Sequence, residues 1–475
     1  MTAAVYEYRV LNTTEAAAGV DGYYYVLQVQ SLLDTGRPYY QTITRLPIYT
    51  FAALAAISGD TIAAVKTASV MLHMLLCLGV FAILHRTTRS KWLGLVGSWV
   101  LLIPTSRFYL LAEFLNQLTA VTLLVWSGWA LIRAKQTGRR MWFLFSAVFG
   151  TAAMFSHKSA SVIVVTIVAS FAAVGWLHRD KRRAAVAILG VVICASAPAI
   201  IAAQELFAVP QWLQSQVSAY PQNPLKTPFL AEGILLIIVS VVMLIVLLRT
   251  GNGLAFNRIL AALALWSLIV TMNPFLNPGA LLSGLAGRLR VVSHVQLGLL
   301  LPPLICILWA AHKRTAYYLV FVAVILLLAS GRGPWPRGLQ PEYLSTRNSL
   351  IRALKDNPAA LAPNSIVIAP HGDQFVVTAT LGLASQQRPP RQGQYQNFYW
   401  LLNDVMDEEL ASKSIVLFRK YSMATIIIDD HAFQSYWRHM TDKERRDLLS
   451  ANPHLNGSRR ALAAKFVDAG VYATS

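Results

Sequence analysis

The chain has 475 residues, of which 55% are hydrophobic and only 13% charged, and its mean hydropathy is +0.49. Globular domains usually carry about 25% charged residues, so these values exclude a soluble enzyme over most of the length, and they exclude disorder. The net charge of +19 indicates loop anchoring in a membrane protein before it indicates nucleic-acid binding. The three cysteines lie in apolar runs and form no metal-binding knuckle.

The acidic residues divide the chain into three parts. Of the 22, five lie in the first 60 residues, four lie between 61 and 330, and thirteen follow residue 331. We therefore expect a polytopic α-helical membrane protein with an extracytoplasmic first loop at 1–60, a transmembrane domain at 61–330 and a soluble extracytoplasmic α/β domain at 331–475.

Residues 1–60, here called the head, contain two expected helices that are too short to cross a membrane. Asp21-Gly22 is typical of a turn or a helix N-cap, and residues 23–33 follow with Tyr25, Val29, Leu32 and Leu33 near one face. Gly36 supplies a stop signal. A second helix is expected at about 46–57, with Pro47 in its first turn. Both are expected to lie along the membrane interface.

The apolar middle predicts about ten spanning segments, several of them shorter than the usual 20 residues. They are expected near 61–85, 93–110, 113–132, 141–156, 160–177, 184–203, 233–248, 258–273, 291–311 and 315–330.

The loops between these segments alternate in charge. Fifteen Lys and Arg residues fall on one side, in the loops at 86–91, 133–140, 179–183, 249–258 and 313–314. The other side has five: Arg107, Lys158, Lys226, Arg288 and Arg290. The positive-inside rule places the side with fifteen cations in the cytoplasm. The head and the tail (residues 331–475) are therefore both expected outside.

The tail is expected to be a small α/β domain. Residues 365–369 and 424–428 are short buried-strand runs, each followed by polar turn residues. Helical patterns lie near 347–356, 400–411 and 441–450. The turns after the two strands, at Pro370–Asp373 and Asp429–His431, are interpreted as structural.

The head resembles a known family. An acid, then aromatic residues, then a short helix ending in Leu33-x-x-Gly36-x-Pro38-Tyr39 resembles the first extracytoplasmic loop of the type C glycosyltransferase (GT-C) superfamily. The nearest relatives in style are dolichyl-phosphomannose-dependent protein mannosyltransferases and bacterial aminoarabinose transferases. In that family a spanning helix precedes the acid. Only 20 residues precede Asp21 here, so we expect either a longer natural chain or a branch without that helix.

The resemblance implies a set of site residues. It makes Asp21 the catalytic acid of the first loop, where the alternative is a simple N-cap. Glu113 would line the same cavity, and the alternative is a structural carboxylate paired with Arg107. Lys158, beside His157, and Arg288 and Arg290 would bind the donor phosphate, whereas Lys158 could otherwise be an interfacial anchor. Tyr23 and Arg45 are expected to contact substrate.

The chemistry explains why these residue types are needed. Transfer from a lipid phosphate expels a phosphate group whose charge grows in the transition state, and Lys and Arg stabilise it. The acceptor hydroxyl loses a proton, which a carboxylate can take. No His/Cys cluster forces a metal, although metal use varies across the superfamily and leaves a divalent cation open as a cofactor.

We therefore expect an integral membrane glycosyltransferase with a polyprenyl-phosphate-sugar donor and a glycan, lipid or protein acceptor. It would be a multi-pass protein of the inner (plasma) membrane with its active site on the periplasmic or extracytoplasmic face, and nucleic acid is not an expected partner. Three alternatives remain: a secondary transporter or flippase, a multi-span ligase or polymerase of lipid-linked sugars, and a non-catalytic envelope scaffold.

Overall fold

The protein is described by a computed structural model. It describes residues 2–39, 46–177, 230–250, 259–268 and 291–332, together with shorter stretches between 335 and 473. The chain forms two compact units, and each is described by itself. Unit 1 holds Met1–Val10, Ile43–Thr50 and Lys66–Pro336, and unit 2 holds Leu11–Thr42, Phe51–Val65 and Arg337–Ser475.

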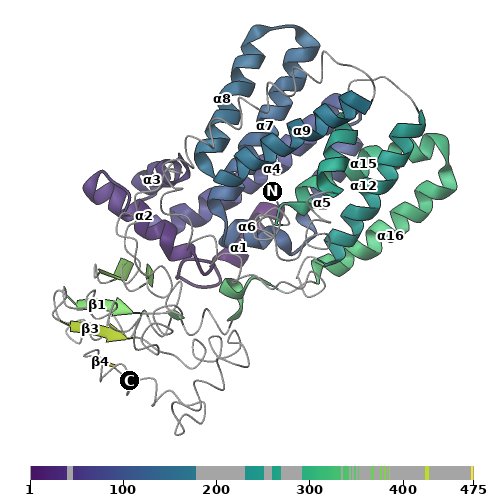
Figure 1. The fold of residues 1–475 in the computed structure, drawn as a ribbon. Helices are drawn as coiled ribbons and strands as arrows, with labels where there is room; N and C mark the ends of the chain where they lie inside the picture. The colour runs from purple at the N-terminus through teal and green to yellow at the C-terminus, as the bar shows by residue number, and fades with distance from the viewer. Residues whose placement is uncertain are drawn as a thin grey trace, which may run out of the picture. The chain divides into compact units, whose positions relative to one another are not determined.

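Unit 1 is built from α-helices (Figure 1). Those that lie wholly or mostly in it are α1 (Thr2–Leu11), α4 (Thr61–Thr88), α5 (Lys91–Leu102), α6 (Ser106–Ala112), α7 (Leu115–Thr137), α8 (Arg140–Ser156), α9 (Lys158–Leu177), α12 (Leu230–Thr250), α15 (Ser293–Ala311), α16 (Lys313–Gly331) and a further helix at 259–268. The sequence patterns did not predict α1, which has ten residues.

Four helices in the described part of the chain are long and apolar enough to cross a membrane: α4, α7, α15 and α16. They have 28, 23, 19 and 19 residues, close to the length that a bilayer core requires. With the α5–α6 pair counted as one broken span, the number is five. The protein is thus a multi-pass helical membrane protein. The count of ten spans stays a prediction, because the expected segment at 184–203 lies outside the described residues.

The expected single span at 93–110 is wrong in one respect. The chain forms two helices there, α5 and α6, which are bent by 74° with respect to each other. Pro104 lies in the break. Proline has no backbone N–H and clashes with the preceding turn, so a helix breaks there. The break places Ser106 and Arg107 at the start of a new short helix.

The core of unit 1 lies where α5, α12, α15 and α16 pack together. Its buried side chains are Leu, Ala and Val, with Met243. α5 and α15 approach closely because Gly97 and Gly298 face each other: a Cβ on Gly97 would lie 2.8 Å from the carbonyl oxygen of Gly298. Small residues that let helix backbones meet are typical of membrane helix packing.

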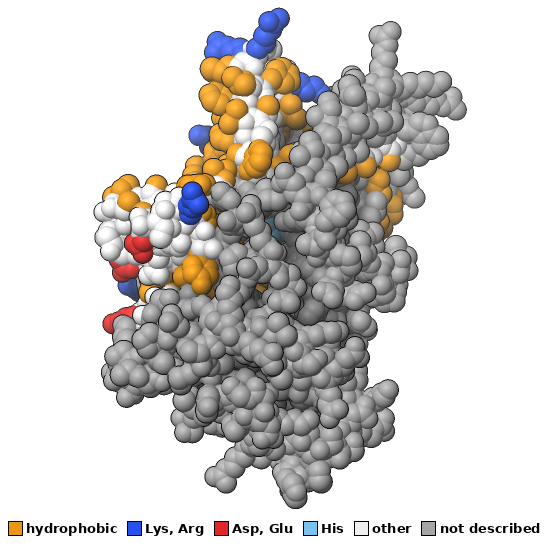
Figure 2. Space-filling view, turned by 60° about the vertical axis from the view of Figure 1, so that its left-hand side comes forward, with side chains coloured by type: hydrophobic (Ala, Val, Ile, Leu, Met, Phe, Trp, Pro, Cys, Tyr) orange, Lys and Arg blue, Asp and Glu red, His pale blue; other side chains and the backbone are white. Residues whose placement is uncertain are grey.

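The α7–α8 hairpin carries an exposed apolar surface. Its turn uses Gly138 in the left-handed region, with φ of 67°. Exposed apolar side chains run along α8, including Phe143, Leu144 and Phe155. Figure 2 shows apolar side chains along this hairpin and Lys and Arg at its end. Apolar flanks with a basic tip are the pattern of a helical hairpin that ends in a cation-rich loop.

Unit 2 contains α2 (Gly22–Thr35), most of α3 (Leu46–Ser58), the 3₁₀ turn Arg337–Leu339 and a four-stranded parallel sheet. Both head helices are therefore confirmed, and α2 ends at Gly36 as expected, with φ of 72° and its N–H bonded to the Leu32 carbonyl. The expected apolar face is only partly right. Tyr25 and Val29 are buried, but Leu33 is 45% exposed because α2 is buried around its N-terminal turns, Gly22–Val29, and exposed at its C-terminal end.

The sheet has the order β2-β1-β3-β4, with β1 at Ser365–Ile368, β2 at Ala384–Ser385, β3 at Met423–Ile426 and β4 at Tyr472–Ala473. β1 and β3 lie at the two predicted strand runs and pair in parallel from Ser365↔Met423 to Ile368↔Ile426. Parallel strands need crossover connections. The helices expected at 400–411 and 441–450, and most of that at 347–356, lie outside the described residues, so the complete α/β domain stays a prediction.

Candidate functional site

Asp21 stands at the entry of α2 in unit 2. Its carbonyl accepts hydrogen bonds from the backbone N–H groups of Tyr24 at 3.0 Å and Tyr25 at 3.4 Å, which begin the helix. Its carboxylate makes no capping hydrogen bond to the first amides of α2, within this fully described helix. Asp21 therefore starts the helix through its backbone, and helix capping does not by itself account for an acidic side chain at this position.

The aromatic residues after Asp21 are buried. Tyr23 and Tyr25 are 5% and 4% exposed. Burial raises the pKa of Tyr23, and the positive charge of Arg347 opposes the rise in part. Burial also raises the pKa of Tyr24 to about 12, opposed by a hydrogen bond with the Gln28 side chain. All three phenols therefore help to anchor the start of α2, and Tyr24 is neutral at physiological pH.

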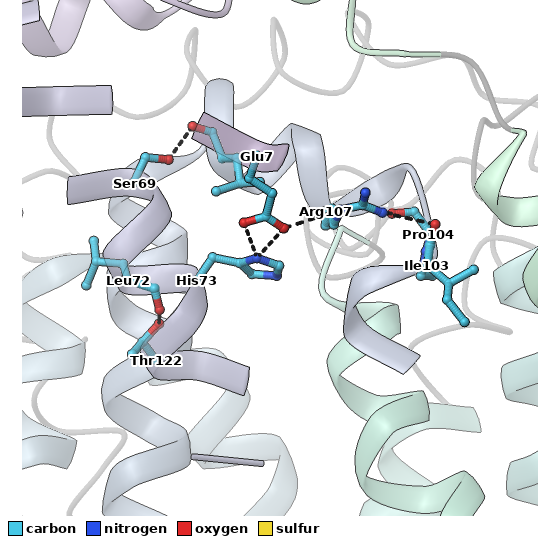
Figure 3. A network of polar contacts seen from close by, with 9 residues as sticks. Glu7, Ser69, Leu72, His73, Ile103, Pro104, Arg107 and Thr122 are labelled. Carbon is cyan, nitrogen blue, oxygen red and sulfur yellow. Dashed lines mark hydrogen bonds and ion pairs between the residues drawn. The ribbon is translucent and has the colours of Figure 1, made fainter. Parts of the chain in front are cut away.

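A buried polar network lies in unit 1, where α1, α4 and α6 meet (Figure 3). The His73 Nδ1–H donates to both carboxylate oxygens of Glu7, at 2.9 and 3.0 Å. Arg107 Nε lies 3.4 Å from Glu7 Oε1. The exposed fractions of Glu7, His73 and Arg107 are 1%, 0% and 7%. Such groups are costly in an apolar surrounding unless they are paired, and here they pair with each other.

Arg107 has further partners. Its Nη1 donates to the carbonyls of Ile103 at 3.0 Å and Pro104 at 2.9 Å, which lie at the helix break. Its guanidinium carbon lies 4.3 Å from the centre of the Phe108 ring, within cation–π range. The alternative pairing of Arg107 with Glu113 is not the one that forms, since the ion pair of Arg107 is with Glu7.

A second group of polar side chains adjoins the first, at the N-terminal ends of α6, α12 and α15. Glu232 Oε2 accepts hydrogen bonds from Ser106 Oγ at 2.8 Å and Ser293 Oγ at 2.6 Å. Ser106 Oγ also lies 3.1 Å from His294 Nδ1. Because the Ser106 proton is used on Glu232, His294 Nδ1–H is the donor to Ser106. The two groups meet where the rings of His73 and His294 lie 6.3 Å apart, centre to centre.

The two groups together form a double network. Several of its buried polar atoms make no hydrogen bond within the described residues. Among the described residues, His73 Nε2, His294 Nε2 and Glu232 Oε1 have no hydrogen-bond partner. The Nε2 atoms of the two imidazoles and the second carboxylate oxygen of Glu232 are therefore available for hydrogen bonds with hydroxyl groups or water. Unsatisfied buried polar groups are rare in native structures, so these atoms mark the place where a polar ligand or water would bind.

Lys66 is a further buried cation that sequence reasoning missed. It is 4% exposed on α4. Lys66, Ser69 and His73 are three, four and seven residues apart, so they share one face of α4. An ionisable residue inside a spanning segment is a functional candidate by default.

The other predicted site residues are placed as follows. Glu113 follows α6, is 8% exposed, and bonds through its N–H to the Tyr109 carbonyl at 2.9 Å. His157 is the extended residue between α8 and α9, with its N–H bonded to the Ala153 carbonyl at 3.2 Å. Lys158 begins α9, and its side chain lies outside the described residues.

Arg45, Arg288 and Arg290 lie wholly outside the described residues. The expected meeting of Lys158, Arg288 and Arg290 therefore stays a prediction. No cluster of three or more His, Cys, Asp or Glu side chains suited to a metal ion occurs within the described ranges.

Six residues of the double network were not predicted as site residues: Glu7, His73, Ser106, Glu232, Ser293 and His294. Glu232 had a visible signal, because it is one of only four acids between 61 and 330. His73 lies within α4, the longest of the apolar spanning helices among the described residues, and a histidine in such a segment is a second usable signal. Glu7 and the two serines carry no local signal.

One comparison with known proteins gives a family for part of the chain. Residues 45–201 match the family described as dolichyl-phosphate-mannose-protein mannosyltransferase. The match confirms the resemblance to the GT-C superfamily and indicates a membrane glycosyltransferase that uses a lipid-linked sugar. The matched range includes His73, Ser106 and Arg107. No curated protein matches the chain.

Proposed function

We propose that this protein transfers a sugar from a polyprenyl-phosphate donor to an acceptor hydroxyl on the extracytoplasmic face of the membrane. The observation that carries the proposal is the family match over residues 45–201, which begins next to the start of α3 and so does not include Asp21. The multi-pass helical fold with buried charged networks supports it, because ionisable groups are kept inside membrane segments where function needs them.

The proposed reaction is a single displacement. The acceptor hydroxyl gives its proton to the Asp21 carboxylate, and its oxygen attacks the anomeric carbon. The bond from that carbon to the phosphate oxygen breaks, and the electron pair leaves with the polyprenyl phosphate. Attack opposite the leaving group inverts the anomeric centre.

Cations carry the second half of the mechanism. Lys158, Arg288 and Arg290 stabilise the negative charge that grows on the leaving phosphate, and His157 contributes beside Lys158. Glu113 orients sugar or acceptor hydroxyls, and Tyr23 and Arg45 contact substrate. The acceptor class is a glycan, a lipid or a protein.

The test is the substitution Asp21→Asn, assayed by release of polyprenyl phosphate from labelled polyprenyl-phosphate sugars in envelope vesicles. Asn caps helices as well as Asp does, so the fold should persist. Loss of a general base should lower the rate by about 10²-fold or more. Asp34→Asn is the matched control, because Asp34 is an exposed acid near the other end of the same helix.

The paired substitution Glu113→Gln should cost less than Asp21→Asn, since an orienting group transfers no proton. Binding of polyprenyl phosphate should survive in both variants. A fully active Asp21→Asn protein would remove the base from the mechanism.

A further inference from the structure

The segment after residue 337 holds the backbone that leads into Asp21. Arg347 is 1% exposed. Its Nη1 donates to the carbonyl of Gly19, and its Nη2 donates to the carbonyl of Val20 at 3.2 Å. One planar guanidinium thus donates to both carbonyls immediately before Asp21. Arg347 is 328 residues from Gly19 and 327 from Val20 in the sequence.

A second contact reaches the same loop through backbone atoms alone. The Gly19 N–H donates to the Gly338 carbonyl at 3.3 Å. A Cβ on Gly338 would overlap the backbone of Gly19 and Val20. Gly19 itself has φ of 86°, in the left-handed region that favours glycine. Two glycines therefore permit an approach that no larger residue allows.

A third set of contacts holds the residues that follow Asp21. The guanidinium carbon of Arg347 lies 5.7 Å from the centre of the Tyr23 ring. The Tyr24 ring meets the Phe375 ring edge-on at 5.5 Å. Residues from beyond 337 thus fix the chain on both sides of Asp21, within unit 2.

We propose that Arg347 is a positioning residue that sets the location of the Asp21 carboxylate through the Gly19 and Val20 carbonyls. The inference rests on the proposed function, in which Asp21 is the base. Arginine suits the role because its rigid fork serves two acceptors at once, whereas lysine offers a single point of charge on a flexible stem. Catalytic groups tolerate little displacement: an error of about 1 Å can cost about 10²-fold in rate.

The experiment compares Arg347→Gln, Arg347→Lys and Gly338→Ala in the full chain. Gly338→Ala disturbs the same loop by steric overlap and leaves Arg347 in place. Arg37→Gln is the matched control, since Arg37 is an exposed arginine that follows α2. Amide hydrogen exchange of residues 17–25, measured by mass spectrometry, shows whether Arg347 and Gly338 restrain this loop, and it does not depend on any activity.

The expected exchange result is faster exchange at 17–25 in Arg347→Gln and Gly338→Ala, with α4 and α7 unchanged, and a smaller effect in Arg347→Lys. The kcat for release of polyprenyl phosphate should fall by about 10²-fold, while KM for the polyprenyl-phosphate sugar changes little. The decisive comparison is Arg347→Gln on an Asp21→Asn background. It should cost nothing further, because Arg347 acts only through Asp21.

Unchanged exchange at 17–25 would overturn the inference, and so would an equal further loss of kcat on the Asp21→Asn background. Failure of the proposed function looks different. Asp21→Asn would then be fully active, while the exchange of residues 17–25 would still respond to Arg347→Gln. That result would show that Arg347 restrains the loop but that the restraint does not serve catalysis by Asp21.

Discussion

Removal of the Glu7 carboxylate should destabilise unit 1 by a predictable amount. Glu7→Ala removes the acceptor of His73 Nδ1–H at 2.9 Å and the partner of Arg107 at 3.4 Å. Breaking a buried ion pair costs about 3–5 kcal/mol when the remaining charge is left uncompensated. Arg107 keeps its bonds to the Ile103 and Pro104 carbonyls, so we expect the lower end of that range, about 3 kcal/mol.

Glu7→Gln separates the charge from the hydrogen bond. The amide oxygen still accepts from His73, but it no longer attracts Arg107. A hydrogen bond to a charged group contributes about 1.5–3 kcal/mol, against about 0.5–1.5 for a neutral one. We therefore expect Glu7→Gln to cost about 1–2 kcal/mol, between the wild type and Glu7→Ala.

Unfolding of the protein in mixed micelles with rising denaturing detergent, followed by tryptophan fluorescence, measures these values. Glu15→Gln is the control, because Glu15 is exposed and should change the free energy of unfolding by less than about 0.5 kcal/mol. A double-mutant cycle with His73→Ala should show coupling of at least about 0.5 kcal/mol. Additive losses in that cycle would refute the pairing.

Two other results are expected. Cysteines introduced at Lys135 and Gln340, in a background without native cysteines, should be labelled by impermeant maleimide from the cytoplasmic and the exterior side respectively; the reverse labelling would contradict the proposed orientation. Burial raises the pKa of Tyr24 to about 12 against about 10 in an unfolded chain, so the folded state holds this proton more tightly. Thermal stability should therefore fall between pH 10 and 12, by about 1.4 kcal/mol per pH unit for this group. Tyr24→Phe should remove that part of the decline, and an unchanged slope in this variant would contradict the assignment.

Local signals predicted several elements of this fold. Asp21-Gly22 and Gly36 bound α2, and Pro47 lies in the first turn of α3. Two short β-branched runs became β1 and β3. Each of these signals acts within a few residues, through a cap, a stop, a fixed φ or a strand propensity, and so it can be read from the sequence alone.

The polar contacts could not be predicted in the same way. His73 and Glu7 are 66 residues apart, Ser106 and His294 are 188 apart, and Arg347 lies 328 residues from Gly19. Which helix ends meet is decided by packing of the apolar faces, and a single sequence does not reveal that choice. The Pro104 break illustrates the limit: the apolar run continued through it, so hydrophobicity indicated one span where a proline created two helices.

That break also explains why the buried charges gather where they do. A helix interrupted inside an apolar layer exposes carbonyl and amide groups that lipid cannot satisfy. Here Arg107 takes the Ile103 and Pro104 carbonyls, and Thr105 donates its N–H and its hydroxyl to the Ser330 carbonyl at 3.2 and 3.0 Å. Arg107, which donates to the carbonyls at the break, brings a positive charge into the interior. The Glu7 carboxylate pairs with that charge. The same break starts α6 at Ser106, whose hydroxyl links Glu232 to His294. The break at Pro104 thus accounts for the positions of Arg107 and Ser106, one in each half of the network, and it lies within the matched residues 45–201.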